Sequence, residues 1–540
     1  MATEPLFHLP APIPSWPPGN GFGSGVIKLG GGLQVCQVSN FRKIWATQEG
    51  GSSNKGATFY EPASVPGGFF VLGHYGQSND KTLDGWVLLA KEDTDNGGGT
   101  NGGVLMKPVD FTLVWNSASL GIKQDGNGYI WRPTPPNGYA AVGCIVSTSA
   151  SKPPLEAVRC VRTDLTDQCQ ADAWIWGPNK TQDSNGLNIF SLRPGNRGIQ
   201  GMGVAVGTFD ASPSSASNTQ LACLKNINPT FSSMPNVKQI QAIFQAYSPC
   251  IYLHPDEKYH PSSVTWYFSQ GALLFKRGET NPVQIDQTGS NLPQGGGNDG
   301  EYWIDLPADK KDGVKRGDLQ SATVYLHVKP MLGGTFTDLA MWVFYPFNGP
   351  GRAKVGFITV PFKFLGQHAC DWEHITLRVS NFNGELKSLY CSAHSGGSWV
   401  PASELEFYNG SNKPVTYSSL NGHAMFTKAG VVMQGSDEIG LRNDTAKSNM
   451  MIDAGSRYEL VAAEYLGQQI VEPPWLNYLR VWGPKVTYDS ENELKDIEKH
   501  LPGNLRSRFD KFIRSLPKEL LGEEGPTGPK VKRNWAGDEI

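Results

Sequence analysis

The sequence predicts a mainly β protein with two domains and a short helical C-terminal tail. Glycine occurs 63 times and proline 38 times in 540 residues, while charged residues make up only 18%. Short strands joined by tight turns fit this composition better than long helices do. Many apolar runs of strand length also lie between Gly-rich turns. We predict an N-terminal β domain over residues 1–230, a β-sandwich over residues 236–488, and the tail over residues 489–540.

The first domain contains an internal repeat. The segment "FYEPASVPGGFFVLGHY", beginning at Phe59, is echoed by "IWRPTPPNGYAAVGCIV", beginning at Ile130. A weaker copy, "FSLRPGNRGIQGMGVAVGTF", begins at Phe190. Each copy has a strand, a Pro-Gly turn and a short apolar strand that closes on Gly. Because proline cannot donate a backbone hydrogen bond, these prolines should lie at strand ends and edges. The pattern predicts a pseudo-three-fold β domain.

The second domain begins after the loop at residues 228–236. Apolar residues at helical spacing predict one short helix that Pro249 ends: Val237, Ile240, Ile243, Phe244 and Tyr247. Further on, the runs "VTWYF", "ATVYLHVKP", "DLAMWVFYPF", "KVGFITVPF", "HITLRVS", "ELKSLYCSA" and "VVMQGS" are read as strands of a sandwich. The eight cysteines are scattered and predict buried, reduced thiols.

Charge and motifs exclude several classes of function. The formal net charge of −3 argues against nucleic acid as a partner, because phosphate binding needs a basic surface. The first residues lack the pattern of a signal peptide, and no apolar run is long enough for a membrane span, so we expect a cytoplasmic protein. Phosphate-binding loops, nucleophile elbows and His-Glu-x-x-His sequences are absent from the sequence.

The segment "GQHACDWEHITLRV", at residues 366–379, opens a core strand with charged residues. Side chains alternate along a strand, so Asp371 and Glu373 should lie at the rim of one face. A divalent cation would relieve the repulsion between them, and oxygen ligands favour Mg²⁺, Ca²⁺ or Mn²⁺. His368 would complete the group. Arginines such as Arg378 and Arg352 are the alternative partners, with His368 capping a turn. On the opposite face we expect packing by Trp372 and a hydrogen-bonded surface histidine at His374.

Long motifs through most of the chain resemble a plant family labelled vacuolar-protein-sorting-associated. They include the two front repeats, "GSNLPQGGGNDGEYWIDLP", "VKPMLGGTFTD", "RNDTAKSN" and "GEEGPTGPK". The family includes fern proteins with insecticidal activity, which implies a defence role. Its label implies membrane trafficking instead. The front repeats also resemble β-prism domains that bind acidic membranes, which implies a β-prism-like first domain.

Residues from about 250 to 430 resemble the necrosis- and ethylene-inducing-like cytolysins, whose Gly-His-Arg-His-Asp-Trp-Glu motif is similar to "GQHACDWE". This resemblance implies a cytolysin- or actinoporin-like sandwich with a divalent cation held by His368, Asp371 and Glu373. A further family ligand, an aspartate, falls on Asn348, which would hold the ion more weakly. The second motif histidine falls on Cys370. Two histidines and one tryptophan beside a glycine turn are candidate binding residues: His394, His423 and Trp399.

Taken together, the residues and the resemblances predict a non-enzymatic plant defence protein. It would bind glycan or lipid headgroups, or a gut receptor, on a target membrane, permeabilise that membrane, and oligomerise there. Two alternatives stay open: an intracellular membrane-trafficking or lipid-binding adaptor, and a metal-dependent hydrolase in which a hydrated cation supplies the nucleophile.

Overall fold

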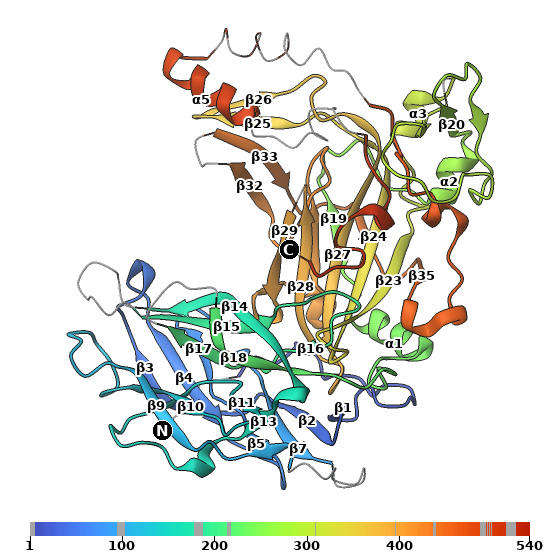
Figure 1. The fold of residues 1–540 in the computed structure, drawn as a ribbon. Coiled ribbons are helices and arrows are strands. Elements are labelled where there is room, and N and C mark those ends of the chain that lie inside the picture. Colours follow the sequence, from blue (N-terminus) through green and yellow to red (C-terminus); the bar gives the residue numbers. More distant parts are fainter. Residues whose placement is uncertain are drawn as a thin grey trace. The chain divides into compact units, whose positions relative to one another are not determined.

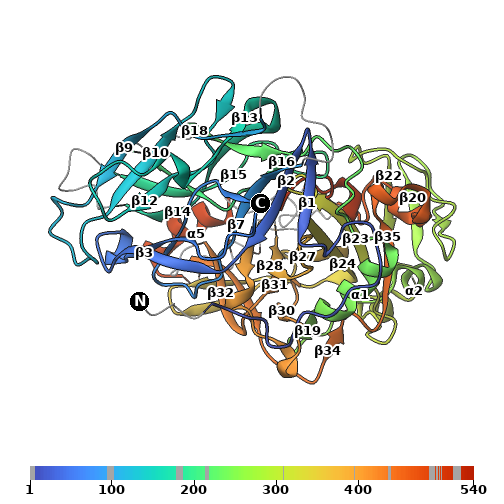
Figure 2. The same ribbon diagram turned by 90° about the horizontal axis from the view of Figure 1, so that it is seen from below.

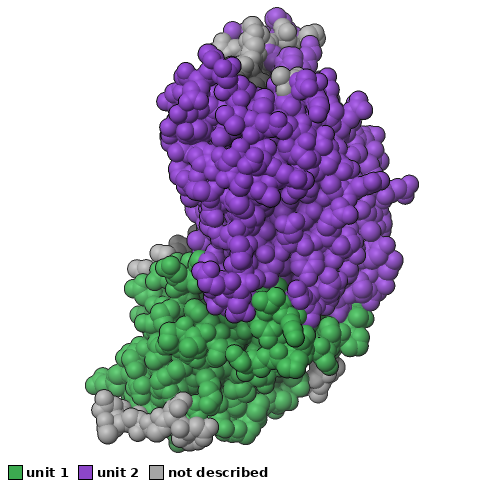
Figure 3. Space-filling model, turned by 90° about the vertical axis from the view of Figure 1, so that its right-hand side faces the viewer, with its two compact units in different colours: residues 1–240, 330–337, 379–385 green, residues 241–329, 338–378, 386–540 purple. Residues whose placement is uncertain are grey.

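The computed structural model describes residues 6–93, 103–177, 187–212, 218–307, 309–394, 396–435, 439–485, 493, 495, 497, 499, 501–514 and 525–539. The chain divides into two compact units (Figure 3). Unit 1 comprises residues 1–240, 330–337 and 379–385, and unit 2 comprises residues 241–329, 338–378 and 386–540. Both units are built mainly from strands (Figure 1), so the predicted mainly β class is confirmed.

In unit 1 the predicted repeat corresponds to a strand order that recurs three times. In each copy, the strand that carries the motif proline is the middle one of three antiparallel strands. The three sets are β3-β4-β6 (Phe41–Thr47, Ala57–Pro62, Tyr75–Ser78), β9-β10-β12 (Asp110–Asn116, Tyr129–Thr134, Ile145–Ser147) and β14-β15-β17 (Thr166–Trp176, Asn188–Pro194, Phe209–Ser212).

A second set of strands repeats in the same way. The short strand after each Pro-Gly turn pairs with the last strand of its own copy, and that last strand also pairs with an earlier one. The sets are β2-β7-β5 (Leu33–Val38, Val87–Glu92, Phe70–Val71), β8-β13-β11 (Leu105–Met106, Cys160–Arg162, Tyr139–Ala140) and β14-β18-β16, with β18 at Asn218–Lys225 and β16 at Gly203–Val204. Strand β1 (Val26–Gly30) extends the first set.

The three copies meet where their short strands end. The backbone N–H of His74 donates to the carbonyl of Cys144 at 2.9 Å, and the N–H of Cys144 donates to the carbonyl of Phe209 at 3.2 Å. A Cβ atom added at Gly143 would lie 2.7 Å from the side chain of Thr208. The glycine that closes each copy therefore leaves room for the backbones of the other copies.

In unit 2 the largest sheet has six strands in the order β29-β28-β27-β24-β23-β35. Four of them run side by side in Figures 1 and 2: β28 (Leu386–Ala393), β27 (His368–Ser380), β24 (Phe336–Asn348) and β23 (Val324–Met331). The outer strands are β29 (Gly396–Pro401) and β35 (Tyr458–Ala462). We call this the central sheet. Every residue of β23 and β24 is buried, so both faces of these strands are covered.

Three smaller sheets complete unit 2. They are β31-β30-β19-β34 (Met425–Phe426, Val415–Ser418, Cys250–Leu253, Met451–Asp453), β26-β25-β33-β32 (Ile358–Pro361, Arg352–Val355, Ile439–Thr445, Gly430–Gly435) and β21-β20-β22 (Val283–Gln284, Leu273–Lys276, Tyr302–Asp305). The described part of unit 2 also contains the helices α2 (Val264–Ser269), α3 (Lys311–Lys315) and α5 (Gly503–Ile513), and most of α1 (Val237–Tyr247). The main core cluster of this unit joins aromatic residues of the central sheet with later ones, including Trp342, Trp372, Trp475, Trp482 and Trp535.

Of two local predictions, one is confirmed and one is wrong. The predicted helix is present as α1 (Val237–Tyr247), and its apolar face is buried. The run "VTWYF", for which the sequence predicts a strand, is helix α2 instead. The reason is an N-cap, because the Ser263 side chain accepts a hydrogen bond from the Trp266 N–H at 2.9 Å and starts the helix. All eight cysteines are free thiols, seven of them buried.

None of the helices in the described part of the chain is both long enough and apolar enough to cross a bilayer.

Replacing Gly143 by valine should destabilise unit 1. The added side chain would collide with Thr208 in a packed interior, which typically costs about 1–3 kcal/mol. Urea unfolding of the full-length chain, followed by tryptophan fluorescence, measures the change. The matched control is Gly67→Ala, since an added Cβ there meets nothing within 4 Å. Equal stability of the Gly143 variant and the parent would contradict the close approach of the repeats.

Candidate functional site

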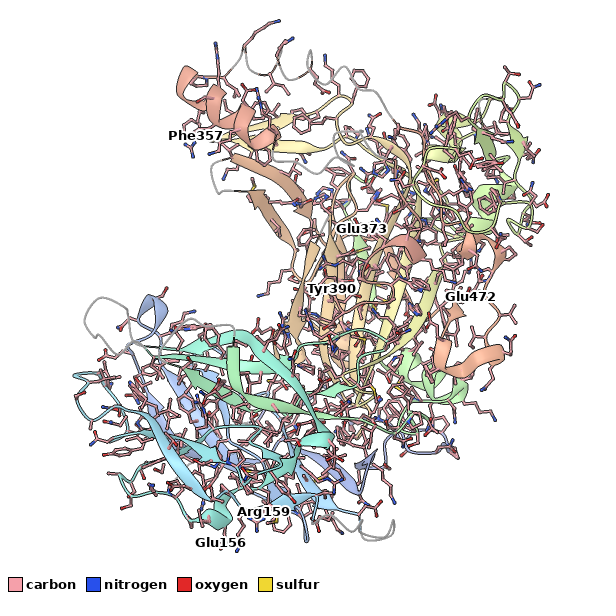
Figure 4. The ribbon with its side chains drawn as sticks, viewed as in Figure 1. Glu156, Arg159, Phe357, Glu373, Tyr390 and Glu472 are labelled. Carbon is pink, nitrogen blue, oxygen red and sulfur yellow. The ribbon has the colours of Figure 1, made fainter. Side chains whose placement is uncertain are left out.

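Unit 2 contains a cavity of about 390 Å³ near the start of β27. Its walls come from distant parts of the sequence: the end of β24, the starts of β27 and β29, the end of β28, and the C-terminal segment, residues 525–539. Polar and charged groups dominate the lining: Asn348, His368, Asp371, Glu373, His374, Ser392, His394, Thr527, Lys532, Arg533, Asn534 and Asp538, with Trp372 and Tyr390 among the rest. Glu373 and Tyr390 are labelled in Figure 4.

Five of the seven predicted site residues line this cavity. They are the four expected cation ligands and one candidate binding histidine: Asn348, His368, Asp371, Glu373 and His394. The structure thus brings together residues that are up to 46 positions apart, from Asn348 to His394. The remaining two, His423 and Trp399, do not belong to the cavity lining.

His423 lies behind the cavity instead of in it. Its imidazole is fully buried and stacks on Tyr345, with ring centroids 3.8 Å apart. Its Nδ1 lies 3.0 Å from Asp371 Oδ2, and its Nε2 lies 3.8 Å from Glu257 Oε2. His423 therefore sits between two carboxylates and holds Asp371 in place, and its role as a binding residue stays a prediction. It lies in the tight turn before β31, where its φ is positive at 56°.

Trp399 lies on the outer strand β29 and is not one of the residues that line the cavity. Its ring faces the Arg378 guanidinium at 4.2 Å and packs on Tyr390, with centroids 5.5 Å apart. This cation-π contact occupies the face that was expected to stack on a ligand.

Asp371 is held in its ionised form. Burial alone would raise the pKa of this carboxyl group. The hydrogen bond from His423 and the positive charges of His368, His423 and Lys532 outweigh burial and hold the pKa of Asp371 below its ordinary value. The carboxylate therefore presents negative oxygen to the cavity at neutral pH.

His368 is fixed in one tautomer by its neighbour. Its Nδ1 lies 2.8 Å from the carbonyl oxygen of Cys370. Because a carbonyl can only accept, Nδ1 carries a hydrogen, and in the neutral form of His368 the lone pair is therefore on Nε2. Cys370 itself has a positive φ of 57°, which interrupts the regular strand between His368 and Asp371. That irregularity lets both side chains reach the same cavity.

The expected arginine partners lie elsewhere. Arg378 binds Asp338 at 2.8 Å and Asp538 at 2.6 Å, and Arg352 binds Asp444 at 2.7 Å. Glu373 instead accepts a hydrogen bond from the Ser392 hydroxyl. The alternative in which these arginines neutralise Asp371 and Glu373 is therefore not the arrangement found.

The donor types around the cavity suit a hard cation, but they are not gathered as ligands. Among the described residues, no group of three or more His, Cys, Asp and Glu side chains is arranged to hold a metal ion. The side-chain N–H of Asn348 donates to the Gly366 carbonyl at 2.7 Å. The side-chain oxygen of Asn348 is therefore the atom that could coordinate a cation. The predicted cation site at Asn348, His368, Asp371 and Glu373 stays a prediction.

The C-terminal segment forms one wall of the cavity, and sequence reasoning did not assign it this role. It is fastened by buried charges on the face of β27 opposite Asp371. Glu539 lies 3.0 Å from His374 Nε2 and 3.6 Å from Lys329 Nζ, and it accepts from the Thr376 hydroxyl at 2.7 Å. His374 is therefore a buried hydrogen-bonding partner of Glu539 and not the expected surface histidine.

The segment is also anchored by packing. Trp535 stacks on His327 with centroids 3.8 Å apart, and Lys329 Nζ donates to the Asn534 carbonyl at 2.9 Å. These contacts carry Lys532 and Arg533 to the cavity opposite Asp371 and Glu373. The segment "KVKRNW" carries no local pattern that predicts its place at the cavity, because the residues that it contacts lie about 150 to 200 positions earlier in the chain.

The resulting cavity has a mixed charge. Asp371, Glu373 and Asp538 supply carboxylates, while Lys532 and Arg533 supply cations. Such a lining offers many directional hydrogen bonds together with aromatic surface from Trp372 and Tyr390. It suits a ligand that carries hydroxyl groups together with charge, as sugar and lipid headgroups do.

The chain belongs to the family described as vacuolar protein sorting-associated protein 62, whose model matches residues 3–539. The first resemblance noted in the sequence is thereby confirmed. A search of curated proteins found no match.

Several solved structures are similar to parts of the chain. GNIP1Aa from Chromobacterium piscinae is 20% identical, with 39% of this chain and 40% of that chain covered and a TM-score of 0.29. Necrosis and ethylene inducing protein 2, from the causal agent of cocoa's witches broom disease, is 14% identical over 34% and 67%, with a TM-score of 0.19. NLPPya in complex with glucosamine is 15% identical over 40% and 76%, with a TM-score of 0.20. The chain thus spans less than half the length of GNIP1Aa, and at these TM-scores the likeness of fold is distant.

Replacing Glu539 by glutamine should destabilise unit 2 at neutral pH, by about 3 kcal/mol, because Lys329 loses its buried counter-charge. Burial raises the pKa of Glu539, but His374, Lys329 and Thr376 outweigh it and hold the pKa well below its ordinary value. The stabilisation of the folded state by the Glu539 carboxylate is therefore complete above about pH 4.3, the usual pKa of a free glutamate. It is lost as the pH falls through the lower folded-state pKa.

Urea unfolding at pH 7 and near pH 3 checks this. The gap between parent and variant should shrink at the lower pH. The exposed Glu404→Gln change serves as control and should alter stability by less than about 0.5 kcal/mol. A gap that grows on acidification would show that Glu539 is not held as a carboxylate.

Proposed function

We propose that this chain is a non-enzymatic plant defence protein that binds glycan or lipid headgroups on a target membrane through the cavity of unit 2. One observation carries the proposal: the cavity collects five residues that the sequence had singled out and adds a cationic wall from the C-terminal segment. The family membership is compatible with this role and also with membrane trafficking.

The two walls would have different tasks. The oxygens of Asp371 and Glu373 can accept hydrogen bonds from sugar hydroxyls, and ionised acceptors make the stronger bonds. Lys532 and Arg533 can pair with a phosphate or carboxylate of the same headgroup. Tyr390 and Trp372 add aromatic surface beside them.

The metal-dependent hydrolase stays the second alternative, because His368 and His394 line the cavity and either could act as its base. A metal-dependent hydrolase would need a base that can reach a bound water or hydroxyl. His423, the imidazole that is hydrogen-bonded to Asp371, is fully buried behind the carboxylate and aims its other nitrogen at Glu257. Its contacts make it a positioning residue for Asp371.

The adaptor alternative shares the same headgroup site, so the two roles differ only in the step after binding. In our proposal the plant keeps the protein in the cytoplasm, and the protein meets its target membrane after ingestion, where copies assemble and permeabilise it. Dye-filled vesicles prepared from insect midgut membrane distinguish the two roles. Leakage supports the defence role, and binding without leakage supports the adaptor.

The variants Asp371→Asn and Glu373→Gln should bind these vesicles at least tenfold more weakly while staying folded. Each removes one ionised acceptor, and hydrogen bonds to charged groups are worth about 1.5–3 kcal/mol. Vesicle co-sedimentation measures affinity, and circular dichroism checks the fold. Asp256→Asn is the matched control, since its side chain is 80% exposed and lies outside the cavity lining. Unchanged binding by both cavity variants would remove the site from the proposal.

The divalent cation is proposed separately. Asn348, His368, Asp371 and Glu373 would hold Mg²⁺, Ca²⁺ or Mn²⁺, which would add a positive centre for headgroup oxygens. Adding EDTA should then weaken vesicle binding several-fold, and excess Mg²⁺ or Ca²⁺ should restore it. Direct titration of the metal into the free protein, followed by calorimetry, tests the site without a membrane. Binding that ignores the chelator would reject the cation and leave the cavity proposal standing.

A further inference from the structure

The tip of the β25–β26 hairpin exposes two adjacent large apolar side chains. Val355 pairs with Ile358, so Gly356 and Phe357 form the two-residue turn. Phe357 is 100% exposed and Ile358 is 42% exposed. In Figure 4 Phe357 lies at the far end of the hairpin from the central sheet. Phe357 lies outside the folded core, while Ile358 is partly covered.

The turn itself does not call for these residues. Two-residue hairpin turns favour Gly, Asn and Asp, and Gly356 supplies the positive φ, 63°, that the turn needs. A phenylalanine in the second turn position has no such conformational reason. Apolar side chains that gather at a projecting tip commonly mark an interaction site.

The hairpin is supported from behind, so the tip has a defined position in unit 2. Strand β25 pairs with β33 through Ala353 with Leu441 and Val355 with Ile439. The side chains of Val355 and Leu441 are buried together with Phe509 of α5. Helix α5 also approaches the turn, since a Cβ added at Gly356 would lie 3.4 Å from Leu505 Cδ1.

Basic residues lie on the hairpin and on helix α5, which packs beside it. The sequence from 349 to 370 contains Arg352, Lys354 and Lys363 and no acidic residue. Arg352 is neutralised by Asp444. Helix α5 adds the exposed Arg506 and Lys511, with Asp510 between them. Among the residues that the structure describes, Glu493 is a further carboxylate of this region, and it accepts from the backbone N–H groups of Phe364 and Leu365 at the other end of the hairpin.

We infer that this tip inserts into an anionic lipid bilayer. Phe357 and Ile358 would enter the boundary of the acyl chains, while Lys354 and the basic residues of α5 contact lipid phosphates. Apolar residues at the boundary with basic residues around them are typical of surfaces that bind anionic membranes. The inference rests on the proposed membrane-binding function and names the element that enters the lipid and the lipid charge that it prefers.

A lipid surface fits the tip better than a second copy of the chain does. A stable protein interface buries at least about 1,200 Å², which two side chains at a turn cannot supply. A symmetric contact between two such tips would also bring like charges together.

A fluorescent label at the tip tests the inference. Phe357→Cys is modified with the polarity-sensitive dye NBD; the dye-treated parent chain gives the background, which should be low because seven of its eight cysteines are buried. The matched control is Val471→Cys, because Val471 is 83% exposed and its neighbour Glu472 lies on the other side of unit 2 in Figure 4. The probes are vesicles of phosphatidylcholine alone and vesicles in which about one lipid in three is phosphatidylserine.

We expect the emission of the label at position 357 to rise and shift to the blue with the anionic vesicles, while the label at position 471 does not change. In co-sedimentation, Phe357→Asp should bind at least about tenfold more weakly, the effect of losing one buried phenylalanine, and Val471→Asp should match the parent.

The possible failures are distinguishable. A chain that binds the vesicles with its label at position 357 still in water overturns the insertion and leaves the proposed function intact. A shift that needs no vesicles and grows with protein concentration identifies a second copy as the occupant and overturns the lipid assignment. A chain that binds neither these vesicles nor midgut membrane overturns the insertion together with the proposed function.

Discussion

The ion pair between Glu539 and Lys329 holds the candidate site together. Lys329 lies in β23, all of whose residues are buried, and a charged amine there is unfavourable without a partner. Glu539, nearly the last residue of the chain, supplies the negative charge, and His374 and Thr376 complete its hydrogen bonds. The C-terminal segment is thus required by the central sheet and not merely packed on it.

Strand β27 carries buried polar groups on both faces. His374, Thr376 and Arg378 bind the C-terminal segment, while Asp371 and Glu373 alternate with them on the other face. Both faces are buried at their polar positions, and each polar group finds a specific partner: Glu539, Asp538, His423 or Ser392. A one-residue shift of this strand would exchange the two environments, so the register of β27 determines both the anchor and the cavity.

Unit 2 combines two different kinds of surface in our proposals. The cavity offers fixed charges and hydrogen-bonding groups, which can select a headgroup by its chemistry. The hairpin tip offers apolar side chains and exposed positive charge, which select a lipid surface without recognising its detail. Unit 1 differs from both, because its three-fold repeat buries its motif residues against one another at Gly73, Gly143 and Thr208. The glycines that end each copy are explained by packing between copies.

Local spacing in the sequence was enough to predict the mainly β class, the three-fold repeat and helix α1, while the cation site at His368, Asp371 and Glu373 stays a prediction. Alternation and turn chemistry make these features readable without a structure. The same reasoning misjudged α2, where a single serine cap overrode a β-like composition. Only the folded structure shows where His423 and residues 525–539 lie. His423 is behind Asp371, and residues 525–539 lie along the cavity wall. Those contacts join residues as far apart as Lys329 and Glu539, and pairing at that distance depends on which charges become buried together, which no local pattern records.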